Sequence, residues 1–70
     1  MFFKNIAEVL VRARDLEVII KVTDDDNVVA QIADVEARGD TLLEALRKLD
    51  LKVKSRIDDV VDSLLSRNMN

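Results

Sequence analysis

Apolar residues recur every three or four positions in the first sixteen residues, which predicts one face of an α-helix. The apolar positions are Phe2, Ile6, Val9, Leu10, Ala13 and Leu16. Asn5 and Glu8 have the spacing of a helix N-cap, so we expect this helix to begin near Ile6. No glycine or proline ends it, and we expect its end near residues 14–16.

The spacing then changes to alternation, which is typical of β-strands. Residues 17–23 (EVIIKVT) place Val18, Ile20 and Val22 on one side, residues 28–33 (VVAQIA) form a second run, and residues 35–38 (VEAR) form a short third one that ends at Gly39. The polar residues 24–27 (DDDN) separate the first two runs and predict a hairpin loop. The three runs therefore predict an antiparallel meander.

Gly39, Thr41 and Glu44 mark the start of the C-terminal helical region. Thr41 and Glu44 have the spacing of a capping box, in which the threonine hydroxyl accepts the N–H of Glu44 and the glutamate reaches back to the N–H of Thr41. Gly39 is the one glycine of the sequence, and it is free to adopt a positive φ, so the chain can turn sharply there.

From Thr41 onward the apolar steps of three and four residues persist, which predicts one continuous helix over residues 41–67. A competing interpretation remains open, because residues 49–54 (LDLKVK) alternate as in a strand. In that case Ser55 and Asp58 have the spacing to cap a separate last helix. The apolar stripe consists of Leu42, Leu46, Leu49, Val53, Ile57, Val60 and Leu64.

These elements predict an α+β protein of order α-β-β-β-α, a three-stranded antiparallel meander with a long C-terminal amphipathic helix. We expect residues 1–70 to form a single domain with helices on one face of the sheet. The sequence contains no cysteine and no histidine, so disulfides and the usual zinc sites cannot stabilise its small core.

The length of the predicted last helix suggests self-association. Residues 41–67 would span about 40 Å as a helix, whereas the strands reach about 20 Å, so half of the helix would have no sheet beneath it. A homodimer or higher oligomer would bury the apolar side chains of that half, although the first helix could also cover them within one chain. The expected interface residues are Val53, Ile57, Val60, Val61, Leu64 and Leu65.

The net charge of −3 is concentrated in the middle of the chain. Residues 24–40 hold six acidic residues and one basic residue, a net charge of −5. Such a region attracts a basic partner and repels nucleic acid. The candidate partner-binding residues are Asp24, Asp25, Asp26, Asp34 and Glu36.

Nucleic-acid binding is not expected. A basic band lies in the middle of the last helical segment, but no aromatic residues are interleaved with it, and a solvated helix face is the preferred interpretation. The band consists of Arg47, Lys48, Lys52, Lys54 and Arg56.

The sequence predicts neither an enzyme nor a cofactor or metal site. Nucleophilic catalysis lacks its usual cysteine or histidine, and residues 24–26 lack the spacing and the glycine of a calcium loop. Asp58 and Asp62 could share a divalent cation, but a solvated helix face is preferred. Since no secretory signal and no membrane-spanning run is present, we expect a cytoplasmic protein without membrane contacts.

Four segments in a row follow the pattern of a known family. They are VIIK at residues 18–21, the acidic turn at 24–27, VAQIADV at 29–35, and GDTLLEAL at 39–46. In this order they resemble the HicB-like antitoxin family, over residues 18–48. The resemblance implies a domain of HicB-like, double-stranded-RNA-binding-like fold. It also implies a non-catalytic protein that sequesters a small, basic, RNA-cleaving toxin. The alternative is a structural or regulatory homo-oligomer, of viral or other origin, with no toxin partner.

Overall fold

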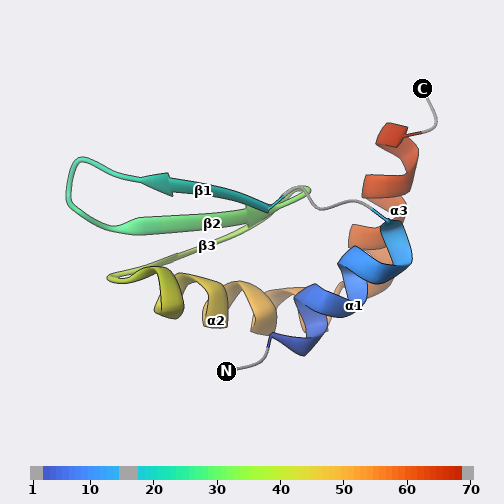
Figure 1. Ribbon diagram of the computed structural model, residues 1–70, viewed down its shortest axis with the longest axis horizontal. Coiled ribbons are helices and arrows are strands. Elements are labelled where there is room, and N and C mark those ends of the chain that lie inside the picture. The colour runs from blue at the N-terminus through green and yellow to red at the C-terminus, as the bar shows by residue number, and fades with distance from the viewer. Residues whose placement is uncertain (1–2, 15–17, 69–70) are drawn as a thin grey trace.

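The computed structural model describes residues 3–14 and 18–68 of the chain. A helix is followed by three strands and two further helices, and the sheet occupies one half of an elongated molecule (Figure 1). The predicted α+β class and the antiparallel meander are confirmed. The elements are α1 (Lys4–Ala13), β1 (Val18–Val22), β2 (Val28–Ile32), β3 (Val35–Gly39), α2 (Leu42–Lys54) and α3 (Ile57–Asn68).

Two tight turns connect the three strands. In the β1–β2 loop, the N–H of Asp26 donates to the Thr23 carbonyl at 3.0 Å, and Asp26 has a φ of 63°. Residues 33 and 34 connect β2 to β3, with Ala33 at a φ of 54°. The hairpin at residues 24–27 and the bend at Asp34 therefore lie where the turn-forming residues predict them.

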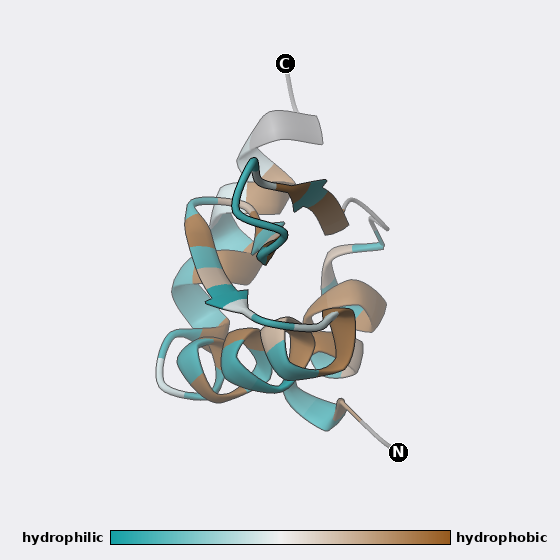
Figure 2. Cartoon of the chain, turned by 90° about the vertical axis from the view of Figure 1, so that its left-hand side faces the viewer, coloured by the Kyte–Doolittle hydropathy of each residue, from teal (hydrophilic) through white to brown (hydrophobic). Residues whose placement is uncertain are grey.

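One face of the sheet is apolar from edge to edge. The register aligns Val18 with Ile32 and Ile32 with Val35, and it aligns Ile20 with Ala30 and Ala30 with Ala37. Helix α2 lies beside β3 and β2 and covers their part of this face, while β1 is the strand farthest from α2 (Figures 1 and 2). Consequently the residues of β2 and β3 on this face are buried except for the half-buried Val28, whereas those of β1 become steadily more exposed.

Gly39 does not use the positive φ that is open to glycine. Its role is to allow a close approach. A Cβ atom at this position would lie 2.6 Å from the backbone nitrogen of Ala45 and 2.9 Å from the Cβ of Glu44. The chain can therefore pass from β3 into the first turn of α2 only because residue 39 has no side chain.

The threonine half of the predicted capping box of α2 is present. The Thr41 hydroxyl accepts the backbone N–H of Glu44 at 3.1 Å, and Thr41 has an extended conformation. The Glu44 carboxylate lies 3.1 Å from the ammonium of Lys48, one helical turn further along. The local spacing thus predicts the start of α2 correctly.

The predicted continuous helix is wrong, because the chain leaves the helix at Ser55 and Arg56. Ser55 is the C-cap of α2, and its hydroxyl donates to the Lys52 carbonyl at 3.3 Å. The alternative of a separate last helix is correct, although residues 49–54 are helical and not a strand. The break allows α3 to turn away from the axis of α2 and pack along α1 (Figure 1).

The start of α1 differs from its prediction as well. The helix begins at Lys4, and its N-cap residue Phe3 makes no side-chain cap. Asp50 of α2 provides the cap instead, because one of its carboxylate oxygens accepts the backbone N–H of Asn5 at 3.0 Å and that of Ile6 at 2.9 Å. The end of α1 is at Ala13, and the predicted stripe residues Phe2 and Leu16 lie outside the described residues.

Most of the predicted oligomer interface is core within one chain. The side chains of Val53, Val60, Val61 and Leu64 are at most 4% exposed, Ile57 is half-buried, and only Leu65 is 38% exposed. The argument from an overhanging helix is therefore wrong, because α1 covers this region. Helices α1, α2 and α3 share one core with strands β2 and β3. This core consists of Ile6, Val9, Ala13, Ala30, Ile32, Val35, Ala37, Ala45, Leu49, Val53, Val60, Val61 and Leu64.

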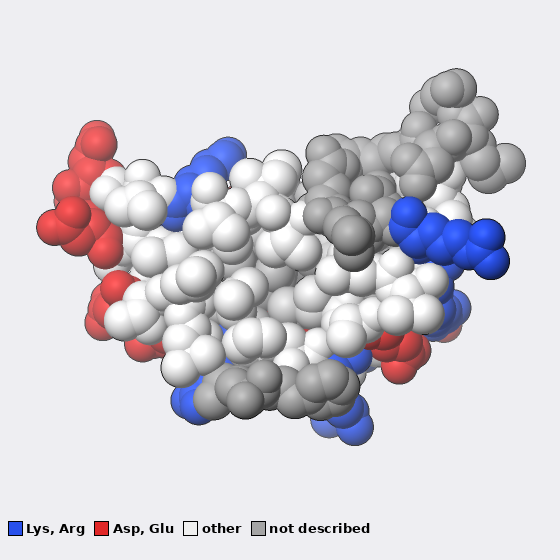
Figure 3. Space-filling view, in the orientation of Figure 1, with Lys and Arg blue, Asp and Glu red and all other residues white. Residues whose placement is uncertain are grey.

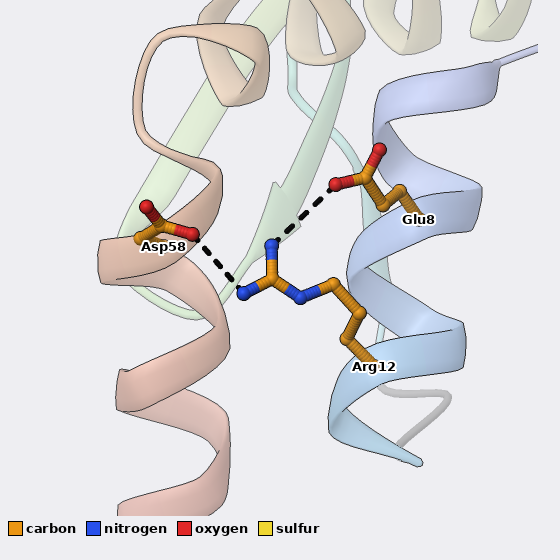
Figure 4. Close-up of polar contacts among 3 residues, drawn as sticks. All are labelled: Glu8, Arg12 and Asp58. Atoms are coloured by element: carbon orange, nitrogen blue, oxygen red, sulfur yellow. Dashed lines mark hydrogen bonds and ion pairs between the residues drawn. The ribbon is translucent and has the colours of Figure 1, made fainter.

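An ion-pair bridge joins α1 to α3 at the surface. The Arg12 guanidinium lies 3.1 Å from the carboxylate of Asp58 and 3.4 Å from that of Glu8 (Figure 4). Exposed pairs of this kind contribute at most about 1 kcal/mol, so burial of the apolar side chains between the two helices holds α3 in place.

Candidate functional site

Four exposed carboxylates gather at one end of the molecule. Asp24, Asp25 and Asp26 form the β1–β2 loop, and Asp40 follows the last residue of β3. Antiparallel pairing of Val28 with Gly39 brings Asp40 to the same end as the loop. Acidic side chains accordingly cluster at the left end of the molecule in Figure 3.

The other two predicted partner-binding residues lie elsewhere. Asp34 occupies the β2–β3 turn at the opposite end of the sheet, where Arg56 lies 3.3 Å from its carboxylate. Glu36 alternates with the buried residues of β3, so its exposed side chain lies on the other face of the sheet. The structure therefore divides the predicted acidic region, and Asp40 replaces Asp34 and Glu36 in the cluster.

Asp40 could have been found from the sequence through strand pairing. If β2 and β3 form a hairpin around residues 33 and 34, the residue that follows Gly39 must lie near the loop that precedes Val28. The net charge of residues 24–40 does not show that Asp40 lies near the loop, because it sums residues that lie on different parts of the surface.

The basic band of α2 is largely engaged with the protein's own acidic and carbonyl groups. Lys48 pairs with Glu44, the Lys52 ammonium donates to the Glu36 carbonyl at 2.8 Å, and Arg56 pairs with Asp34. These contacts give three of the five basic side chains of the band a structural role.

A shallow hollow lies beside this band, at the β3 edge of the sheet where Lys52 of α2 reaches the Glu36 carbonyl. Its volume is about 180 Å³, and it is lined by Val29, Glu36, Ala37, Arg38 and Lys52. Small-molecule pockets are typically about 300–1,000 Å³ and mostly apolar. The hollow is smaller and highly charged, and it does not have the character of a ligand site.

Metal binding has no support in the described part of the chain. Within residues 3–14 and 18–68, no group of three acidic, histidine or cysteine side chains is arranged to hold an ion. Asp58, which the sequence suggested as a ligand together with Asp62, is paired with Arg12.

Apolar side chains remain exposed along β1. Ile19 is 37% exposed, Ile20 44% and Val22 71%, and β1 forms an edge of the sheet. Residues without charge make up much of the middle of the view in Figure 3, to the right of the acidic end. Uncovered apolar surface of this kind is typical of protein-binding regions.

No protein-family model, curated protein or solved structure matches this chain. None of the helices within the described residues has the length and apolar character needed to span a bilayer.

Proposed function

We propose that this protein is a small, non-catalytic, antitoxin-like module that sequesters a basic protein partner through its acidic end. The observation that carries the proposal is the convergence of Asp24, Asp25, Asp26 and Asp40 at one end of the sheet. All four side chains are exposed.

The order of the elements supports the same proposal. A hydrophobic strand, an acidic turn, a second and third strand, and a helix capped by Thr41 follow one another as the HicB-like resemblance implies. Under this proposal the protein acts in the cytoplasm, where an RNA-cleaving toxin would find its substrate.

The electrostatics of the acidic end define how such a partner would bind. Exposed carboxylates on a protruding loop accelerate the encounter with a cationic surface, and the attraction weakens with added salt. We therefore expect tight binding at low ionic strength and a clear loss of association rate as salt is raised.

The test is to search the reading frames that neighbour this gene for a small basic protein and to titrate that protein against two matched variants. Asp24→Asn with Asp25→Asn removes two charges from the acidic end, and Asp59→Asn with Asp62→Asn removes two exposed charges from α3. We expect the first pair to weaken binding about tenfold or more and the second to leave it within about twofold.

Two results would overturn this function. One is the absence of any basic protein encoded nearby that binds the chain. The other is an equal loss of affinity in both double variants, which would mean that the acidic end has no special part in binding.

A structural or regulatory homo-oligomer is the second candidate function. The specific observation in its favour is the exposed apolar strand β1 at the edge of the sheet. In this case the protein would assemble with itself and need no basic partner.

A further inference from the structure

The two edges of the sheet differ in how they are covered. The β3 edge lies against α2, and the Lys52 ammonium donates to the outward carbonyl of Glu36 at 2.8 Å. Within the described residues, β1 has β2 on one side and no strand on the other. Native sheets rarely leave such an edge open, because its unpaired backbone groups are ready to pair with another chain.

The β1–β2 hairpin shows which backbone groups of β1 point toward β2 and which point to the free edge. The N–H of Thr23 donates to the Asn27 carbonyl at 2.8 Å, so Thr23 faces β2. Residues of an antiparallel strand alternate between facing one neighbour and the other. Lys21 and Ile19 therefore also face β2, and the backbone groups of Val18, Ile20 and Val22 point to the free edge.

The side chains of β1 favour pairing of this edge with another strand. Four of its five residues are β-branched and apolar, and Lys21 is the one charged residue. The strand contains no proline and no bulge that would block pairing. Ile20 and Val22 share the apolar face of the sheet with the buried core of β2, yet they are 44% and 71% exposed.

We propose that β1 pairs with β1 of a second copy of this chain, antiparallel and about a two-fold axis at Ile20. The pairing joins the two meanders into one continuous six-stranded sheet. Val18 then lies opposite Val22 of the second copy, Ile20 lies opposite its own counterpart, and the outward backbone groups form about six hydrogen bonds. Apolar β-branched pairs across the new strands cover the exposed side chains.

Self-complementarity identifies the occupant as a second copy. The register centred on Ile20 pairs all five residues of β1 and places Lys21 opposite Ile19, whereas a register centred on Lys21 would oppose two ammonium groups. The antiparallel arrangement also sends the two acidic loops, which directly follow β1, to opposite ends of the shared strands. A parallel arrangement would bring the loops together, and their carboxylates would repel one another.

The size of the interface predicts its strength. A stable dimer typically buries about 800 Å² on each partner, and a five-residue strand pair buries only part of that area. We therefore expect a dimer that dissociates on dilution. It would leave the acidic loop exposed, so this inference goes beyond the proposed function and does not depend on it.

The first test is the molar mass of the purified protein alone, measured by light scattering over a dilution series with the variants Val22→Pro and Val22→Thr. Val22 is 71% exposed and its N–H faces the free edge, so proline removes two intermolecular hydrogen bonds per dimer without breaking the β1–β2 ladder. Threonine keeps the N–H and the branched shape. We expect Val22→Pro to raise the dissociation constant about tenfold or more relative to Val22→Thr.

A second test locates the axis and does not depend on how well the proline variant folds. The chain has no cysteine, so Ile20→Cys introduces a single thiol at the axis, where paired Cα atoms about 5.5 Å apart are within disulfide range. Val11→Cys, on the exposed face of α1, is the matched control because Val11 is 76% exposed. We expect Ile20→Cys to form a linked dimer at least about tenfold faster.

Three results would overturn the proposal: a wild-type protein that keeps the mass of one chain at every concentration, equal dissociation constants for Val22→Pro and Val22→Thr, or equal cross-linking of Ile20→Cys and Val11→Cys. Because no basic partner is present in either experiment, these outcomes are independent of the fate of the proposed function.

Discussion

At Gly39 the last residue of β3 passes directly over the first turn of α2. Any side chain there would meet the backbone of Ala45, which cannot move without disturbing the start of the helix. The requirement is for space and not for an unusual φ, because the φ of Gly39 is not positive.

Replacement of Gly39 by alanine tests this contact. We expect Gly39→Ala to lower the free energy of unfolding by about 1–3 kcal/mol, because the new methyl group overpacks the strand-to-helix junction. Arg38→Ala, at the neighbouring exposed position, should change it by less than about 0.5 kcal/mol. Urea denaturation of both variants measures the difference, and equal stabilities would show that the junction relaxes freely.

The contacts of a single residue could be predicted where its partner is close in sequence. Thr41 and Glu44 are three positions apart, and the Thr41 hydroxyl accepts the N–H of Glu44 as predicted. The partner of Asn5 is Asp50, 45 positions away, and no local spacing can indicate such a contact. Asn5 is therefore a residue type that often caps helices, but here it donates hydrogen bonds to Asp50 of another helix.

At the scale of elements, Asp50 connects the start of α1 to the middle of α2. Its carboxylate accepts two backbone N–H groups of the first turn of α1, and it also accepts the side-chain amide of Asn5 at 2.9 Å. A carboxylate at this position also interacts favourably with the helix dipole.

Removal of this interhelical cap should be costly. We expect Asp50→Ala to lower the free energy of unfolding by about 1–3 kcal/mol, because it leaves donors of a partly buried helix end without acceptors. Lys54→Ala replaces an exposed charge on the same helix and should be nearly neutral. Thermal unfolding followed by circular dichroism compares the two, and equal melting temperatures would argue against the cap.

The strands and the start of α2 follow from local pattern, whereas the break between α2 and α3 does not. The apolar stripe keeps its phase through residues 55 and 56, and no glycine or proline marks the break. What fixes it is tertiary, because the turn allows Val60 and Leu64 to join the core together with Val9 and Ala13 of α1. A periodic pattern identifies the buried positions but not the helix that buries them.

At the scale of the whole molecule, packing of α1 decides which surfaces remain available to a partner. It covers the apolar half of the C-terminal region, so self-association through Val53, Val60, Val61 and Leu64 would require the core to open. Among the features that remain uncovered are the acidic end and the edge strand β1. The sequence predicted the negative charge of the acidic end, but only the pairing of β2 with β3 shows that Asp40 belongs to it.

The central claim is that a single chain completes its own core by packing α3 against α1. The most direct test is the amide NMR spectrum of Leu64→Asp, with Leu65→Asp as its neighbour control, since Leu64 is 0% and Leu65 38% exposed. An unpaired buried charge costs about 3–5 kcal/mol, which equals the stability that a core of this size supplies. We predict a collapsed, unfolded spectrum for Leu64→Asp and a dispersed, folded one for Leu65→Asp. A folded Leu64→Asp monomer would contradict the claim, because it would show that Leu64 lies in an interface between chains.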